Sequence, residues 1–186
     1  MFRHGFRPYG LIVFCLVLAA CTSLPSPVPR PANWAQPAVA RHVKNLYRVD
    51  EGLYRSAQPD AAGMRELESL GIKTVLDLRL AHSDQHLMRG TSLRAKTVPM
   101  APSAISSRQL RKAVRLIRES EKPVLVHCLH GADRTGAVIA AYRIAEQGWS
   151  REEAVREMRR GGYGHHYLMF PNIREILLHF QPATSQ

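Results

Sequence analysis

The residues best suited to covalent chemistry are a cysteine and an arginine separated by five positions. They lie in the stretch His127-Cys128-Leu129-His130-Gly131-Ala132-Asp133-Arg134-Thr135-Gly136, which we call the cysteine loop. A thiolate is a strong nucleophile, and a guanidinium offers a planar set of donors that can hold two phosphoryl oxygens at once. Gly131 lets the loop turn so that successive backbone N–H groups face inward and bind an anion. The stretch predicts a loop that binds a phosphate group and attacks it with Cys128.

The other residues of the loop have roles that follow from their positions. The hydroxyl of Thr135 can donate a hydrogen bond to the thiolate, which favours the charged form and its departure as a leaving group. His127 can fix the backbone of Cys128, and Gly136 is a further supporting residue. The predicted phosphate-binding residues are Leu129, His130, Gly131, Ala132, Asp133 and Arg134.

The neighbouring elements would place the cysteine loop between a strand and a helix. Pro123–Val126 is a short apolar run with β-branched residues, typical of a buried parallel strand. Residues 137–145 are apolar on most faces and predict a buried helix. A helix N-terminus has unpaired backbone N–H groups and a partial positive charge, so it binds a phosphate dianion and stabilises a thiolate.

The cysteine loop resembles Cys-x5-Arg-Thr-Gly preceded by His, the signature of the cysteine-based protein tyrosine phosphatases. The likeness runs from about Asn45 to Pro171 and is to the dual-specificity branch, especially its periplasmic bacterial members. It includes Gly52–Pro59, Thr74–Arg79 and Gly161–Gly164. The resemblance implies hydrolysis of phosphomonoesters, phosphotyrosine first and phosphoserine or phosphothreonine as further candidates, through a phosphocysteine intermediate and without a cofactor.

The general acid is not evident. In the family it is an aspartate upstream of the signature, but the corresponding loop here, Met100–Ser106, has no Asp or Glu. Ser103 stands near the expected position, and a hydroxyl is too weak an acid for this step. Asp133 is one alternative, because a bacterial subgroup that also acts on phosphoinositides is implicated in using an aspartate there. The alternative role for Asp133 is structural: it would form an ion pair with Arg134 and orient that side chain. Asp84 is another candidate, and absence of any carboxylic acid is the third.

Three other functions stay open. The substrate could be an inositol phosphate or a phosphoinositide rather than a phosphorylated protein. The missing upstream acid is also compatible with a phosphate-binding pseudophosphatase. A sulfur-transfer enzyme has its reactive cysteine in a similarly short loop, but the Arg134-Thr135-Gly136 end argues against it.

The N-terminus predicts export. Residues 1–20 carry Arg3 and Arg7 near their start, followed by an apolar segment. That segment is shorter than the roughly 20 residues that a permanent transmembrane helix needs. Leu18-Ala19-Ala20-Cys21 resembles a bacterial lipobox, in which Cys21 becomes the acylated first residue. Thr22 after it favours the outer membrane. We expect a lipid-anchored protein that faces the periplasm, with ordinary cleavage or an uncleaved anchor as alternatives.

The rest of the chain divides into a tether at residues 21–40 and a phosphatase domain at residues 41–182. The tether contains five prolines, which are typical of an extended linker: Pro25, Pro27, Pro29, Pro31 and Pro37. After export, Cys15 would be lost and Cys21 acylated, which leaves Cys128 as the only free thiol. We expect a monomer.

Charge limits the partners. The 186 residues include 26 basic and 15 acidic ones, and loss of Arg3 and Arg7 with the leader lowers the net charge from +11 to +9. This favours phosphorylated substrates, acidic lipid headgroups or lipopolysaccharide. No aromatic-rich motif accompanies the charge, so nucleic acid is not expected. His82 and His86 have helical metal-ligand spacing, but no carboxylate or cysteine completes a site, and no metal is predicted.

Strands alternate with helices over the predicted domain. Strands are expected at Leu46–Val49, Leu53–Arg55, Ile72–Leu78, Leu93–Pro99 and before the cysteine loop, with a loop at residues 79–90. Helices are expected after Asp60, after Ser106 or Ser107, after Ser150 and from Pro171. The second of these helices has a basic face expected to be solvated: Arg108, Arg111, Lys112, Arg115 and Arg118. The pattern predicts an α/β fold with a central, mainly parallel sheet of about four to five strands flanked by helices, like that of dual-specificity phosphatases.

Overall fold

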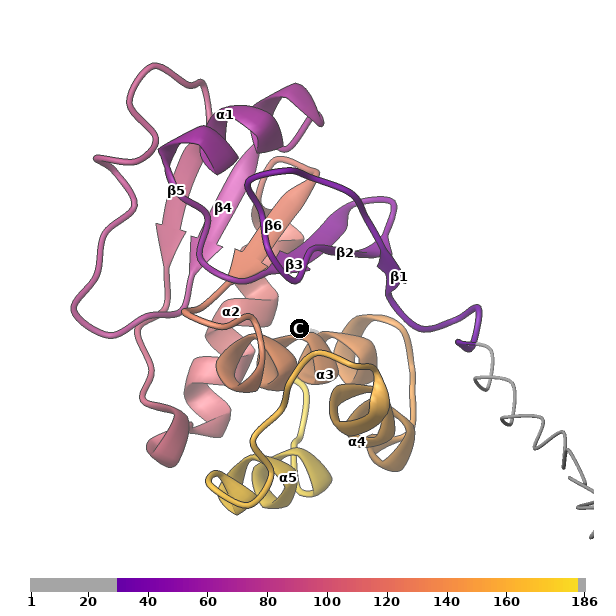
Figure 1. Ribbon diagram of the computed structural model, residues 1–186. Coiled ribbons are helices and arrows are strands. Elements are labelled where there is room, and N and C mark those ends of the chain that lie inside the picture. The colour runs from indigo at the N-terminus through magenta and orange to yellow at the C-terminus, as the bar shows by residue number, and fades with distance from the viewer. Residues whose placement is uncertain (1–29, 184–186) are drawn as a thin grey trace, which may run out of the picture.

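A computed structural model describes residues 30–183, which form a six-stranded sheet with helices on both faces (Figure 1). The strands are β1 (Gln36–Pro37), β2 (Tyr47–Asp50), β3 (Leu53–Ser56), β4 (Thr74–Asp77), β5 (Arg94–Thr97) and β6 (Val124–His127). The helices are α1 (Ala61–Ser69), α2 (Ser107–Glu119), α3 (Asp133–Glu146), α4 (Arg151–Arg160) and α5 (Pro171–Leu178), with a 3₁₀ turn η1 (Pro102–Ala104). The predicted leader and Cys21 lie outside the described residues.

The sheet has the order β1-β2-β3-β6-β4-β5. The pairs β3–β6, β6–β4 and β4–β5 are parallel, whereas β1–β2 and β2–β3 are antiparallel. The predicted α/β fold with a mainly parallel sheet is therefore confirmed. The strand count is one higher than expected, because Gln36–Pro37 adds an edge strand to the predicted hairpin.

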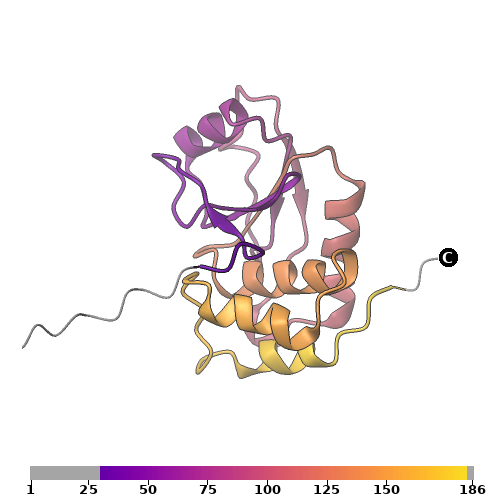
Figure 2. The same ribbon diagram turned by 90° about the vertical axis from the view of Figure 1, so that its right-hand side faces the viewer.

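The two faces of the sheet have separate cores. Side chains of successive strand residues point to opposite faces, so Val75 and Leu125 pack with Met64 of α1. Leu76 and Val126 instead belong to the larger core under α2, α3, α4 and α5. Figure 2 shows this arrangement edge-on, with α1 and the other helices on opposite sides of the strands. Because β4 and β6 are buried on both faces, their inner residues are apolar without polar alternation, and polar residues stand only at the strand ends.

Side-chain caps fix where the helices begin. Asp60 accepts a hydrogen bond from the backbone N–H of Gly63, and Ser106 forms a reciprocal capping box with Gln109. Ser150 accepts from the N–H of Glu153, as predicted. These caps confirm the predicted starts of α1, α2 and α4.

The folded part of the chain begins earlier than the predicted boundary at residue 41. Arg30 donates to the carbonyl of Gly161 at 2.8 Å and to the hydroxyl of Tyr163 at 2.7 Å. The backbone N–H of Ala35, which is fully buried, donates to the Glu157 carboxylate at 2.7 Å. Residues 30–40 are thus packed on the domain rather than extended as part of a tether. Proline content alone did not reveal this, because the partners lie more than a hundred positions away.

Between residues 30 and 183, no helix combines the length and the apolar character that crossing a membrane requires.

Candidate active site

The cysteine loop lies where the carboxyl ends of three parallel strands meet. His127, the last residue of β6, is in register with Ser56 of β3 and Asp77 of β4. Gly131 has φ +70°, and a Cβ atom at this position would lie 2.5 Å from the carbonyl carbon and oxygen of Ser56. Only glycine fits this approach and this backbone conformation, so Gly131 presses the loop against the end of β3.

The carbonyl groups of the loop point outward. Those of Leu129, His130 and Gly131 accept hydrogen bonds, at 2.6 to 3.1 Å, from the Gln58 N–H, Asn45 Nδ2 and Arg55 Nη2, respectively. No backbone N–H of residues 129–132 donates to another group in the range 30–183. With the carbonyls held on the outside, these N–H groups and the N-terminus of α3 are left free, the arrangement that the predicted anion-binding nest requires.

The structure places the predicted nucleophile, Cys128, and the predicted phosphate-binding arginine, Arg134, at this nest. The Cys128 thiol is free and 2% exposed. Arg134, in the first turn of α3, is partly exposed and makes no hydrogen bond or ion pair within residues 30–183. The Thr135 hydroxyl is buried and has no partner in the described chain, so the predicted bond to the Cys128 sulfur is not formed here. Its unpaired donor is available to a thiolate or a bound phosphoryl group.

His127 and Asp84 form a buried pair behind the nucleophile. Nε2 of His127 lies 2.7 Å from Oδ2 of Asp84, and both side chains are almost completely buried. Burial alone would raise the pKa of Asp84, but hydrogen bonds from His127 and Gln58 outweigh it and hold that pKa below its usual value. Nδ1 of His127 lies 3.4 Å from the carbonyl oxygen of Cys128. Asp84 therefore orients His127, and both its oxygens are occupied inside the protein rather than directed at a leaving group.

Asp84 also belongs to a cluster that the sequence did not predict. His82 lies with its Nδ1 3.1 Å from Asp77 Oδ2 and 3.5 Å from Asp84 Oδ1. The expectation that no carboxylate completes a site with His82 is wrong, because β4 and the loop after it place Asp77 and Asp84 beside it. Asp77 also accepts from the Arg79 N–H at 2.8 Å. These contacts explain the cluster as the support that holds Asp84 against His127.

Asp133 is held by two histidines from the loop between α4 and α5. One oxygen accepts from Nδ1 of His165 and from the N–H of His166, and the other lies beside Nδ1 of His166, each at 2.8 Å. Burial opposes ionisation, but these hydrogen bonds prevail and lower the pKa of Asp133 to about 2. At neutral pH Asp133 is a carboxylate without a proton to give. This geometry does not support the general-acid role that the resemblance implied, and it shows no ion pair with Arg134.

Arg55 is a site residue that the sequence did not single out. It is 1% exposed, and its guanidinium lies 3.6 Å from the centroid of the Tyr163 ring while donating to Gly131. Burial lowers the pKa of Arg55, and its electrostatic interactions, first those with Tyr163 and Glu157, oppose that shift. Arg55 thus places a buried positive charge behind the cysteine loop. The sequence offered only its place in the predicted strand Leu53–Arg55 as a signal.

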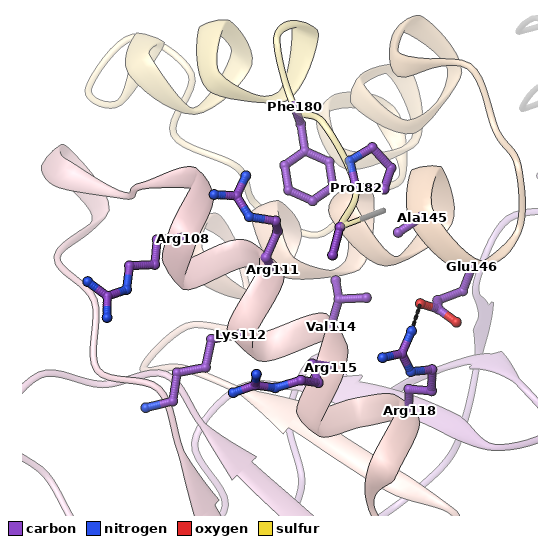
Figure 3. A pocket seen from close by; sticks show the side chains of 11 residues that line it. Arg108, Arg111, Lys112, Val114, Arg115, Arg118, Ala145, Glu146, Phe180 and Pro182 are labelled. Carbon is purple, nitrogen blue, oxygen red and sulfur yellow. Dashed lines mark ion pairs between the residues drawn. The ribbon is translucent and has the colours of Figure 1, made fainter. Parts of the chain in front are cut away.

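A second hollow lies away from the cysteine loop. It is about 600 Å³ in volume and lies between α2 and the C-terminal residues around Phe180 (Figure 3). The basic face of α2 lines it, and its only acidic group, Glu146, is 3.8 Å from Arg118. No residue of the cysteine loop takes part. The hollow adds positive potential to the surface but contains none of the predicted chemistry.

Comparison with known proteins agrees with this arrangement. Residues 49–148 match the family model described as "Polymorphic toxin system, DSP-PTPase phosphatase". The dual specificity protein phosphatase TpbA of Pseudomonas aeruginosa is 38% identical over 138 residues, which are 73% of this chain and 62% of the relative. The chain thus spans less than two thirds of that relative's length. The inositol diphosphatase DSP1 of Oryza sativa subsp. japonica is 31% identical over 53% of this chain and 49% of its own length.

A solved structure shows the same fold. The crystal structure of a cysteine-to-serine variant of P. aeruginosa TpbA in complex with pTyr superposes with a TM-score of 0.72 and 32% identity, and the match covers 80% of this chain and 91% of that chain. The family model covers β3, β6, the cysteine loop and α3. The chain belongs to the DSP-PTPase phosphatase family, within the cysteine-based protein tyrosine phosphatase superfamily.

Proposed function

We propose that this protein is a phosphatase that hydrolyses phosphomonoesters through a phosphocysteine intermediate. The observation that carries the proposal is the cysteine loop itself. Its carbonyl groups are hydrogen-bonded on the outside, Cys128 is buried and free, and the guanidinium of Arg134 is unpaired within residues 30–183. The pseudophosphatase and sulfur-transfer alternatives are less favoured, since neither needs Cys128, Arg134 and Thr135 together.

The residues divide the reaction between them. The Cys128 thiolate attacks phosphorus, and the inward N–H groups with Arg134 stabilise the charge on the equatorial oxygens. Arg55 donates to the Gly131 carbonyl and so holds the loop in place behind the nucleophile. Thr135 donates to the sulfur as it leaves in the second step, when water hydrolyses the phosphocysteine. No cofactor enters this sequence of steps.

Phosphotyrosine is the substrate that the comparisons favour, because the structural relative TpbA binds pTyr. An aryl leaving group departs readily, so it depends less on a strong general acid than phosphoserine does. The rice relative is named an inositol diphosphatase, which keeps inositol phosphates as the second candidate. Nucleic acid and metals have no role in this proposal.

The purified domain should release phosphate from p-nitrophenyl phosphate, and faster from a phosphotyrosine peptide than from the same peptide with phosphoserine. The physical reason is the lower basicity of the phenolate leaving group. Phosphate release is measured with both peptides and with an inositol phosphate at equal concentration. Binding of phosphotyrosine with no release from any substrate would instead establish a pseudophosphatase.

The proposed location is the bacterial cell envelope. Cys21 in its lipobox-like context would carry the lipid, and the following residues would connect it to the domain that begins by Arg30. The net charge of +9 without the leader suits an anionic membrane surface. The outer membrane, facing the periplasm, is the proposed site, and the protein would act there as a monomer.

In the native bacterium, Cys21→Ala should move the protein from the membrane fraction to the soluble fraction. Several acyl chains hold a protein firmly, whereas none remain without the acceptor sulfur. Fractionation with mass spectrometry of the N-terminus measures this, and Cys15→Ala is the matched control. Unchanged membrane association of Cys21→Ala, with no lipid mass on the wild type, would favour the uncleaved anchor.

A further inference from the structure

The described site lacks a carboxylic acid that can protonate a leaving group. The loop of residues 100–106 has none, Asp84 is occupied by His127, and Asp133 is a carboxylate fixed by two imidazoles. Any proton donor must therefore be another kind of group close to the cysteine loop. The two histidines on Asp133 are titratable side chains held at the first turn of α3, next to the cysteine loop.

The two histidines differ in exposure. The side chain of His165 is 1% exposed, whereas that of His166 is 43% exposed. The His166 ring lies edge-on to the ring of His130, a cysteine-loop residue, with centroids 5.9 Å apart. Nδ1 of His166 is engaged by Asp133, and its Nε2 makes no hydrogen bond to any group in residues 30–183. His166 therefore presents one free ring nitrogen beside the phosphate nest, while His165 is enclosed.

We propose that His166 is the proton donor to the leaving oxygen, and that Asp133 is the carboxylate that orients it. The proposal rests on the phosphatase function proposed above and names a residue for one of its steps. In its protonated form, His166 donates from Nδ1 to Asp133 and keeps Nε2–H for the substrate. The carboxylate thereby fixes the orientation of the ring. His165 holds the other oxygen of Asp133 and so positions the carboxylate.

The proton balance closes over two steps. As the sulfur–phosphorus bond forms and the ester P–O bond breaks, Nε2–H passes its proton to the departing oxygen and His166 becomes neutral. In the second step, Nε2 takes a proton from the water that attacks the phosphocysteine, and the Cys128 thiolate departs. His166 returns to its protonated form, so no external acid is consumed.

The test compares leaving groups. His166→Asn keeps an amide N–H for Asp133 but removes Nε2, so kcat/KM for phenyl phosphate should fall by about 10²-fold. With p-nitrophenyl phosphate, whose phenolate leaves unaided, the loss should be less than about fivefold. Both substrates are assayed on the wild-type chain and each variant, with thermal unfolding as a check on folding.

His165→Asn is the matched control, because it changes the same residue type on the same carboxylate. It leaves the donor in place and disturbs only the carboxylate that orients it, so it should lower kcat/KM for phenyl phosphate less than His166→Asn does, with little effect on p-nitrophenyl phosphate. Equal losses for the two substrates in His166→Asn would overturn the proposal, as would a greater selectivity between the substrates in His165→Asn than in His166→Asn. Failure of the wild-type chain to hydrolyse p-nitrophenyl phosphate would instead overturn the proposed phosphatase function, because that substrate needs no acid.

Discussion

Cys128→Ser should reduce kcat by more than about 10³-fold while the fold stays intact. A serine hydroxyl is hardly ionised at neutral pH, so the nucleophile is lost although the volume barely changes. Cys128 is 2% exposed and makes no disulfide, so its replacement by the slightly smaller serine disturbs little packing. The inward N–H groups and Arg134 remain, so the variant should still bind an unreactive phosphotyrosine analogue.

Three measurements distinguish this expectation from its alternatives. Phosphate release gives kcat, calorimetry gives the affinity for the analogue, and thermal unfolding gives the stability of the variant. Rapid acid quench should trap phosphate on the wild-type chain and none on Cys128→Ser. Residual turnover above about one per cent would reject Cys128 as the nucleophile.

The parts of the site that the sequence predicted are local. The nest needs a glycine, the start of a helix and a preceding strand. All three lie within the segment 123–145. Gly131 is the clearest case, because its positive φ and its contact with Ser56 leave room for no other residue. Cys128 and Arg134 follow from the same short segment, so their spacing was enough to place them.

The parts that the sequence missed depend on distant contacts. Asp133 is next to Arg134 in the chain, but its chemistry is decided by His165 and His166, 32 and 33 positions further on. Arg55 reaches the loop across 76 positions. Their local patterns do not distinguish such residues clearly from surface charges. The pairing of β3 with β6 brings Arg55 to the loop, and the segment after α4 brings the two histidines to Asp133.

In the fold, too, features set by nearby residues could be predicted and features set by distant contacts could not. Strand and helix starts followed from apolar runs and caps such as Asp60 and Ser106, which act within a few residues. The start of the domain did not, because Arg30 and Ala35 are held by Gly161, Tyr163 and Glu157. A proline-rich segment looks the same in sequence whether or not distant residues bind it.

Arg134→Lys should lower kcat/KM by about 10²-fold or more without a comparable loss of stability. A lysine keeps the charge but cannot donate two parallel hydrogen bonds to the equatorial oxygens, whose charge must be stabilised in the transition state. Because Arg134 makes no hydrogen bond or ion pair within residues 30–183, its replacement breaks no contact of the free protein.

Arg115→Lys, on the exposed face of α2, is the matched control for the chemical change. It should leave kcat/KM and the unfolding temperature unchanged. Arg55→Lys gives the opposite contrast, because that side chain is buried against Tyr163 and donates to Gly131, so it should lower stability and activity together. If the Arg134→Lys variant is less stable but has normal turnover per folded molecule, then Arg134 has a structural role. Loss of turnover with an unchanged unfolding temperature assigns it to the transition state, where the nest has its largest effect on the rate.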